Sequence, residues 1–248
     1  MNPTISLKIK RCDTQDGETY WEEFTIPYKP SMNIISCLME IQKNPVNARG
    51  ERTSPVTWES SCLEEVCGSC TMVINGHVRQ ACSTLVDKLT QPITIESMTK
   101  FPRVRDLVVN RKGLFENLKR VKAWIAIDGT HDLGPGPRMS AGEQTVGYEL
   151  SRCMMCGCCL EACPQVNSHS NFVGAAIISQ ARLFNMHPTG QMNADERIDA
   201  LMGDGGLSDC GNAQMCVEAC PKEIPLTTSI AEMERSATKR AFKRLLGT

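Results

Sequence analysis

The sequence has little that would place it within a membrane or on an export route. No apolar run approaches the roughly 18 residues that span a bilayer. Residues Met1–Lys10 alternate polar and apolar side chains and contain no apolar core of a signal peptide. We therefore expect any attachment to a membrane to come from a partner.

Motifs for nucleotides and covalent haem are also missing. No G-x-G-x-x-G lies between a strand and a helix and no Walker lysine is present, so we expect no flavin or NAD site in this chain. No C-x-x-C is followed by histidine, which argues against c-type haem. The 4 histidines are scattered without ligand spacing. A net charge of −1 provides no strong field for nucleic acid, so we expect no nucleic-acid partner.

Cysteine, in contrast, is abundant, with 14 in 248 residues. This is below the roughly 8–10% of a small disulfide scaffold. In a reducing cytoplasmic compartment, so many cysteines favour metal binding over disulfides.

Apolar periodicity predicts a small α+β sheet domain over residues 1–108. Alternating residues predict strands, and Ile34, Leu38 and Ile41 recur at helical spacing after Ser31, a candidate N-cap. Cys37 lies on the apolar face of that helix, so we interpret it as a core residue. The expected strands cover residues 5–9, 24–26, 72–74 and 93–95.

The first cysteine motif falls inside this domain. Cys62, Cys67, Cys70 and Cys82 follow the plant-type C-x4-C-x2-C…C spacing of a 2Fe–2S cluster. A four-cysteine zinc site is the alternative, but such sites usually come as two paired C-x2-C knuckles. A Rieske centre needs two histidines, and only His77 is near.

The second half, residues 109–248, is predicted to be a helical domain. The last helix has an apolar stripe of Ile230, Met233, Ala237 and Leu245. Its cations could face anionic lipid or an acidic partner, although a solvated face is the more common explanation. A loop rich in Gly and Pro is expected over His131–Arg138. The expected helices cover residues 106–126, 174–185, 194–202 and 227–246.

A second cysteine motif lies in this half. Cys153, Cys156, Cys159 and Cys163, followed by Pro164, have the C-x2-C-x2-C-x3-C-Pro spacing of bacterial ferredoxins. In two-cluster proteins the cysteine before the proline ligates the other cluster. A partner run exists at Cys210, Cys216 and Cys220, but it is one cysteine short because Ala213 occupies the second position.

The crossing rule then predicts two ligand sets. Cys153, Cys156, Cys159 and Cys220 are expected to hold a 4Fe–4S cluster. Cys163, Cys210 and Cys216 remain for the other, and three thiolates predict a 3Fe–4S cluster. Cys158 is out of phase and is expected not to be a ligand; the alternative is that it replaces Cys159. No catalytic residue is predicted, and three clusters without a substrate motif indicate an electron carrier.

The order of these motifs resembles the iron–sulfur subunit of succinate dehydrogenase and fumarate reductase. Phe101-Pro-Arg-Val-Arg-Asp-Leu107 and the cysteine runs, including the missing cysteine, are the residues similar to that family. The resemblance implies a β-grasp ferredoxin domain followed by an α-helical ferredoxin domain. It also implies a flavoprotein subunit with covalent FAD, a membrane anchor, and electron flow to quinone through 2Fe–2S, 4Fe–4S and 3Fe–4S clusters. Fumarate reductase, working in the reverse direction, is the close alternative.

The chain departs from the family at two positions. Members that reduce ubiquinone beside this subunit have a tryptophan shortly after the Cys-Pro and a histidine after the first cysteine of the last run. Here these positions are Gln165–Ser168 and Gly211. The chain looks more like Gram-positive enzymes with a dihaem cytochrome b anchor and menaquinone, given Leu133–Arg138 and Asn185–Gly190. The expected location is peripheral, on the cytoplasmic face of the cell membrane.

Three other classes of protein remain as rivals. Two-cluster subunits of soluble oxidases and heterodisulfide reductases have complete second runs and lack the plant-type domain. A free ferredoxin would be small and strongly acidic, unlike this chain with its net charge of −1. A zinc-bound interaction module would be colourless.

Overall fold

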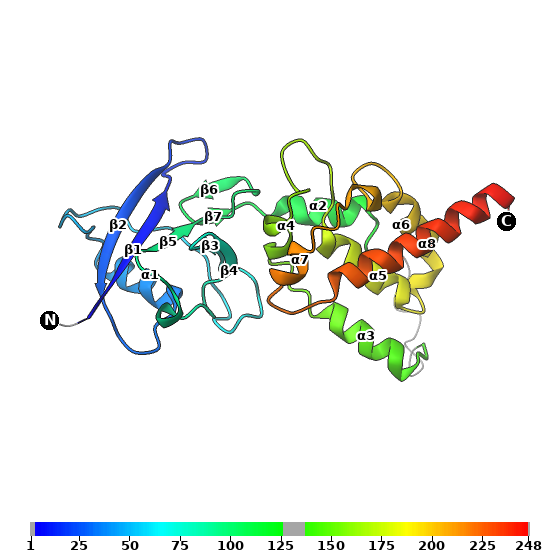
Figure 1. The fold of residues 1–248 in the computed structure, drawn as a ribbon, viewed down its shortest axis with the longest axis horizontal. Coiled ribbons are helices and arrows are strands. Elements are labelled where there is room, and N and C mark those ends of the chain that lie inside the picture. Colours follow the sequence, from blue (N-terminus) through cyan, green and yellow to red (C-terminus); the bar gives the residue numbers. More distant parts are fainter. Residues whose placement is uncertain (1–2, 126–136, 248) are drawn as a thin grey trace. The chain divides into compact units, whose positions relative to one another are not determined.

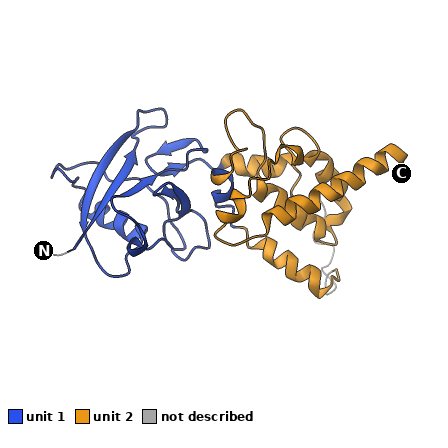
Figure 2. Ribbon diagram, in the orientation of Figure 1, with its two compact units in different colours: residues 1–111, 154–161 blue, residues 112–153, 162–248 orange. Residues whose placement is uncertain are grey.

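The computed structural model describes residues 3–125 and 137–247. Its contacts divide the chain into two compact units (Figure 2). Unit 1 comprises residues 1–111 and 154–161, and unit 2 comprises residues 112–153 and 162–248. That residues 1–108 and 109–248 are two separately folding domains remains a prediction.

Unit 1 is built on a five-stranded mixed sheet (Figure 1). Its order is β2-β1-β5-β3-β4, with β1 and β5 parallel and the other neighbouring pairs antiparallel. Alternate residues of β1 are buried because the sheet has one face in the core. This mixed sheet, with a helix against it, confirms the predicted α+β class. The strands are β1 (Thr4–Arg11), β2 (Tyr20–Pro27), β3 (Thr71–Ile74), β4 (His77–Gln80) and β5 (Ile93–Glu96).

Helix α1 (Ile34–Lys43) buries its apolar stripe in the same core as the sheet. Cys37 is 0% exposed on that stripe, which confirms it as a core residue. The predicted N-cap was wrong. Asn33 caps the helix, accepting at Oδ1 from the backbone N–H of Ser36 at 2.8 Å, and Ser31 lies earlier, with φ of 64°.

The helix expected from Asp106 begins later, because that carboxylate is used elsewhere. Asp106 is 1% exposed, and its Oδ1 accepts from Arg11 Nε at 2.8 Å and from Cys12 N at 3.1 Å. Its Oδ2 accepts from Thr57 N at 2.8 Å. The Asp106 carboxylate thus connects the end of β1 at Arg11 to the loops that contain Cys12 and Thr57. The chain forms the short η1 (Val86–Lys88), β6 (Arg103–Arg105) and β7 (Val108–Val109) before helix α2 (Lys112–Arg120).

Unit 2 is helical, and its longest helix, α8, packs along α5 (Figure 1). The helices expected near residues 174–185, 194–202 and 227–246 are confirmed, while the loop expected over 131–138 lies outside the described residues as far as residue 136. No helix among the described residues is long and apolar enough to cross a membrane. The elements are α3 (Ala141–Ser151), α4 (Cys158–Ala162, mostly in unit 1), α5 (Ala175–Met186), η2 (Gly190–Asn193), α6 (Ala194–Leu201), η3 (Leu207–Asp209), α7 (Met215–Glu218) and α8 (Leu226–Leu246).

The apolar stripe of α8 is buried only in its first half. Ile230 and Met233 are 6% and 2% exposed, whereas Leu245 is 85% exposed. The helix extends past the helices that cover it. Its cations are partly paired within unit 2: Arg240 Nε donates to Asp199 Oδ1 at 3.0 Å. These pairs favour the solvated-face explanation of its charge.

Residues 154–161 belong by their contacts to unit 1, far from it in sequence. The backbone of Gly68, at φ of +73°, lies so close to Cys156 that an added Cβ would be 2.7 Å from the Cys156 Cβ. Glu161 accepts from the backbone N–H groups of Thr99 at 2.8 Å and Lys100 at 3.0 Å. Residues from the N-terminal part of the chain therefore hold the segment 154–161 near both of its ends.

We expect Asp106→Ala to destabilise unit 1 by about 3–5 kcal/mol, because it leaves the buried Arg11 guanidinium without its main partner. Hydrogen exchange of the β1 amides measures the loss as a lower free energy of opening. Lys8→Ala is the control, since the Lys8–Glu23 pair is exposed and such pairs contribute about 0–1 kcal/mol. Equal effects of the two variants would contradict the prediction.

We expect Gly68→Ala to lower the iron content of the purified protein, since its Cβ would displace Cys156. Gly76→Ala is a matched control: its φ is +76° and no atom lies within 4 Å of the added Cβ. Both variants incur about 1–2 kcal/mol of backbone strain, and only Gly68→Ala adds about 1–3 kcal/mol of overpacking. Iron and acid-labile sulfide per chain measure the difference. An unchanged content in Gly68→Ala would show that the close approach is not needed.

Candidate metal centres

The loop from Cys62 to Cys70 directs backbone N–H groups at its own sulfurs. Leu63 and Glu65 have φ of 62° and 59°, the left-handed region that turns successive N–H groups to one side. Cys62 Sγ accepts from the N–H of Val66 at 3.2 Å and of Cys67 at 3.3 Å. Such donors stabilise thiolates, which are the form that binds iron.

The four cysteines of this loop and its return strand lie together in unit 1. Burial alone would raise the pKa of Cys67, but hydrogen bonds from the Cys62 and Ser69 groups hold it at about 6. Burial and the neighbouring Cys70 thiol raise the pKa of Cys82 to about 12. Within this group of thiols, the pKa of Cys67 is therefore lowered and that of Cys82 is raised. A positively charged iron centre would allow the remaining thiols to ionise.

Two polar side chains that the sequence analysis missed lie behind this loop. Arg111 donates from Nη1 to the Gly68 carbonyl at 2.8 Å and from Nη2 to the Ser69 carbonyl at 2.6 Å. Gln80 is 0% exposed and hydrogen-bonds Thr71. No motif signals either residue, because both act through the fold rather than through spacing.

Residues 154–161 bring two cysteines of the second motif, Cys156 and Cys159, into unit 1 together with Cys158. A hydrogen bond from the Cys158 thiol lowers the pKa of Cys156 to about 7 despite its burial. The same bond, with burial, raises the pKa of Cys158. Cys156 is thus favoured as the thiolate of the pair and Cys158 as the thiol. Cys159 is also buried, and Cys153 and Cys220 belong to unit 2.

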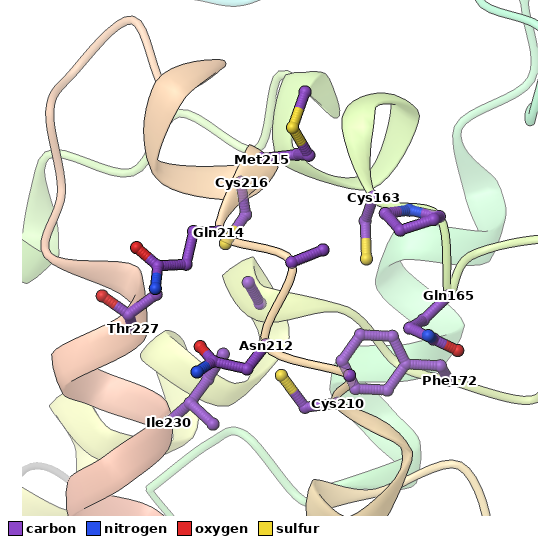
Figure 3. Close-up of a pocket in the computed structure, with 14 residues that line it drawn as sticks. Cys163, Gln165, Phe172, Cys210, Asn212, Gln214, Met215, Cys216, Thr227 and Ile230 are labelled. Carbon is purple, nitrogen blue, oxygen red and sulfur yellow. The ribbon is translucent and has the colours of Figure 1, made fainter.

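Unit 2 contains a pocket lined by Cys163, Cys210 and Cys216 (Figure 3). The three sulfurs point into the same space, which has a volume of about 350 Å³ including its opening to solvent. Burial, followed by the neighbouring Cys163, raises the pKa of Cys216. The structure therefore gathers the three cysteines that the sequence assigns to the last cluster. Ala213 lines the same pocket, at the position where a fourth cysteine is missing.

The two positions that depart from the family also line this pocket and lie against each other. A Cβ at Gly211 would be 2.5 Å from the amide nitrogen of Gln165. The Gln165 side chain therefore occupies the space that a larger residue at 211 would take. Phe172 and Ile230 add an apolar lining (Figure 3).

In the ranges 3–125 and 137–247, no group of three or more His, Cys, Asp or Glu side chains is arranged to hold a single metal ion. A zinc site needs its sulfurs at about 2.3 Å from one point. An iron–sulfur cluster is larger, because its thiolates are distributed over two or more irons.

Family models match both halves of the chain. A 2Fe-2S iron-sulfur cluster binding domain matches residues 6–116, and a 4Fe-4S dicluster domain matches residues 149–224. The chain therefore has the two ferredoxin domains that the sequence predicts.

Full-length relatives agree with these models. The chain is 60% identical to the succinate dehydrogenase iron-sulfur subunit of Bacillus subtilis over 99% of this chain and 97% of the relative. It is 29% identical to the fumarate reductase iron-sulfur subunit of Wolinella succinogenes, over 95% and 98%. A chain of the Mycobacterium smegmatis Sdh1 complex has a similar fold, with a TM-score of 0.80 at 23% identity over 98% of each chain. The chain belongs to the family of succinate dehydrogenase iron–sulfur subunits, the electron-transfer subunits of succinate:quinone oxidoreductases.

Proposed function

We propose that this subunit takes electrons from the FAD of a flavoprotein subunit and delivers them to a membrane quinone through three clusters. Each cluster, when bound, accepts and releases one electron at a time. The residues of this chain hold the clusters and set their surroundings. The proposed ligands are Cys62, Cys67, Cys70 and Cys82 for 2Fe–2S; Cys153, Cys156, Cys159 and Cys220 for 4Fe–4S; and Cys163, Cys210 and Cys216 for 3Fe–4S.

The observation that carries this proposal is the pocket of unit 2. Three cysteines from two separate sequence runs line it together with Ala213. Three thiolates match the three irons of a 3Fe–4S cluster, and alanine leaves no ligand for a fourth. An electron-transfer subunit with a three-iron centre distinguishes this proposal from a ferredoxin with two complete 4Fe–4S runs.

The first ligand set is supported by the donors around it. Backbone N–H groups of the 62–70 loop point at Cys62 and Cys67, and Arg111 orders the carbonyls of Gly68 and Ser69. Hydrogen bonds and charge near the sulfurs favour the reduced state of a bound cluster.

The proposed electron acceptor is menaquinone, reached through a membrane-anchor subunit that is a dihaem cytochrome b. The tryptophan and histidine of ubiquinone-reducing members have no counterpart in this sequence. The Gln165 side chain occupies the space beside Gly211 instead. The quinone site then belongs to the anchor rather than to this chain. We place the subunit on the cytoplasmic face of the membrane, bound peripherally through that anchor.

Affinity purification of the tagged subunit from its native membrane tests this assignment. We expect a flavoprotein and a cytochrome b with haem b to co-purify, and the complex to transfer electrons from succinate to a menaquinone analogue. A complex without haem b would contradict the proposed anchor. Faster fumarate reduction than succinate oxidation would favour fumarate reductase, because this chain does not determine the direction.

We expect Ala213→Cys to convert the three-iron centre into a four-iron one, since residue 213 lines the pocket with the other three cysteines. Electron paramagnetic resonance of the oxidised complex should lose the signal of the 3Fe–4S cluster, and iron per chain should rise by about one.

Ser208→Cys is the control, because it adds an exposed cysteine nearby on η3. It should leave the oxidised-state signal unchanged. A wild-type complex without such a signal would show that the three-iron assignment is wrong.

A further inference from the structure

Gln80 is a buried carboxamide that contacts cysteines of both ferredoxin motifs. It ends strand β4 and is 0% exposed. Its Nε2 donates to Thr71 Oγ1 at 2.8 Å and to Cys158 Sγ at 3.4 Å, while its Oε1 accepts from Cys70 Sγ at 3.6 Å. One side chain therefore joins a proposed 2Fe–2S ligand to a thiol of the second motif.

Cys158 extends this connection to Cys156. It is 0% exposed, and its side chain hydrogen-bonds that of Cys156, a proposed 4Fe–4S ligand. Cys158 is out of phase with the C-x2-C-x2-C spacing and is not among the proposed ligands, so its S–H can act as a donor. The side chains of Cys70, Gln80, Cys158 and Cys156 thus form a continuous hydrogen-bonded chain, and all four lie in unit 1.

Cluster binding changes which end of the Gln80 amide can face Cys70. A ligating cysteine is a thiolate, which can only accept hydrogen bonds. Rotation of the amide presents Nε2 to Cys70 and turns Oε1 towards Thr71, and the hydrogen bond from Nε2 to Cys158 is then lost. The Thr71 hydroxyl can then donate to Oε1, because the Gly68 carbonyl that it contacts at 2.7 Å also accepts from Arg111 at 2.8 Å.

We propose that, in the cluster-bearing protein, Gln80 donates a hydrogen bond to Cys70 and Cys158 donates one to Cys156. These two positioning residues would set the reduction potentials of the 2Fe–2S and 4Fe–4S clusters. The proposal rests on the ligand sets given under the proposed function. A hydrogen bond to a ligand sulfur stabilises the reduced cluster, which carries one more negative charge, so each bond raises the potential on its own side.

The two bonds act on the step between these clusters. With both clusters bound, the electron passed from the first to the second would move with no bond made or broken and no proton transferred. The difference between the two potentials determines how far this step proceeds. Gln80 and Cys158 therefore adjust the two ends of the step separately, although they touch each other.

Gln80→Met and Cys158→Ala test the proposal in the purified complex. Gln80→Met keeps the length of the side chain and removes its donor, so we expect the potential of the 2Fe–2S cluster to fall. Cys158→Ala should lower the potential of the 4Fe–4S cluster. We expect about a tenfold change in the ratio of oxidised to reduced cluster in each case, equivalent to about 59 mV for one electron. Potentiometric titration followed by electron paramagnetic resonance measures both potentials, and iron analysis measures cluster content.

Two matched controls separate this effect from a loss of packing. Cys37→Ala removes another thiol that is 0% exposed in the core of unit 1, and Gln91→Met removes an exposed carboxamide. Neither should shift a potential. Cys158→Ser retains a donor, so it should hold the potential near the wild-type value.

A failure of this inference can be distinguished from a failure of the ligand assignment. Full cluster content with unchanged potentials in Gln80→Met and Cys158→Ala would overturn the inference and leave the ligand sets intact. Loss of the 4Fe–4S cluster in Cys158→Ala, with its retention in Cys159→Ala, would make Cys158 a ligand and overturn both. If Cys158→Ala and Cys159→Ala both lose the 4Fe–4S cluster, Cys158→Ser tests the hydrogen bond to Cys156. A 4Fe–4S potential near the wild-type value supports the inference, and a lower potential overturns it.

Discussion

The close approach of Gly68 to Cys156 is the contact on which the arrangement of unit 1 depends. Only a residue without a side chain permits it, since an added Cβ would be 2.7 Å from that of Cys156. The positive φ of Gly68 also turns its carbonyl towards Arg111, which binds it together with the Ser69 carbonyl. Gly68 thus permits the turn of the first cysteine loop and also contacts the segment that contains cysteines of the second motif.

Gathering thiolates in a buried space is electrostatically unfavourable, and the chain offsets this cost in different ways at different sites. In the 62–70 loop the offset comes from backbone N–H groups, held by left-handed residues. At Cys156 it comes from a neighbouring thiol and from the positive charge of Arg111. Around Cys216 burial and the neighbouring Cys163 outweigh the backbone donors and raise the pKa of its thiol.

Much of this organisation could be predicted from residue spacing. The cysteine motifs require several thiolates to converge on one small group, so their spacing indicates both the cofactor and the local turn. The structure gathers Cys163, Cys210 and Cys216 as the crossing rule predicts. The assignment of each cysteine to a cluster remains a prediction, because spacing describes reach and not bonding.

Contacts between distant segments could not be predicted in the same way. The helix expected from Asp106 starts at Lys112 because Arg11, near the start of the chain, takes the Asp106 carboxylate. Gln80 and Arg111 belong to no motif, and their importance emerges only when residues 154–161 are placed in unit 1. Likewise, the spacing of Ile34, Leu38 and Ile41 indicates a helix but does not identify Asn33 as its cap.

The membership of residues 154–161 in unit 1 has a consequence for biosynthesis. Proteins are made from the N-terminus, and domains generally fold as they emerge. Here residues 1–111 leave the ribosome before residues 154–161, the segment that contacts Gly68 and Gln80. During translation the surface at Gly68 and Gln80 stays open, and it closes only after residue 161 has been added. The first cysteine loop is therefore synthesised before the segment that packs against Gly68.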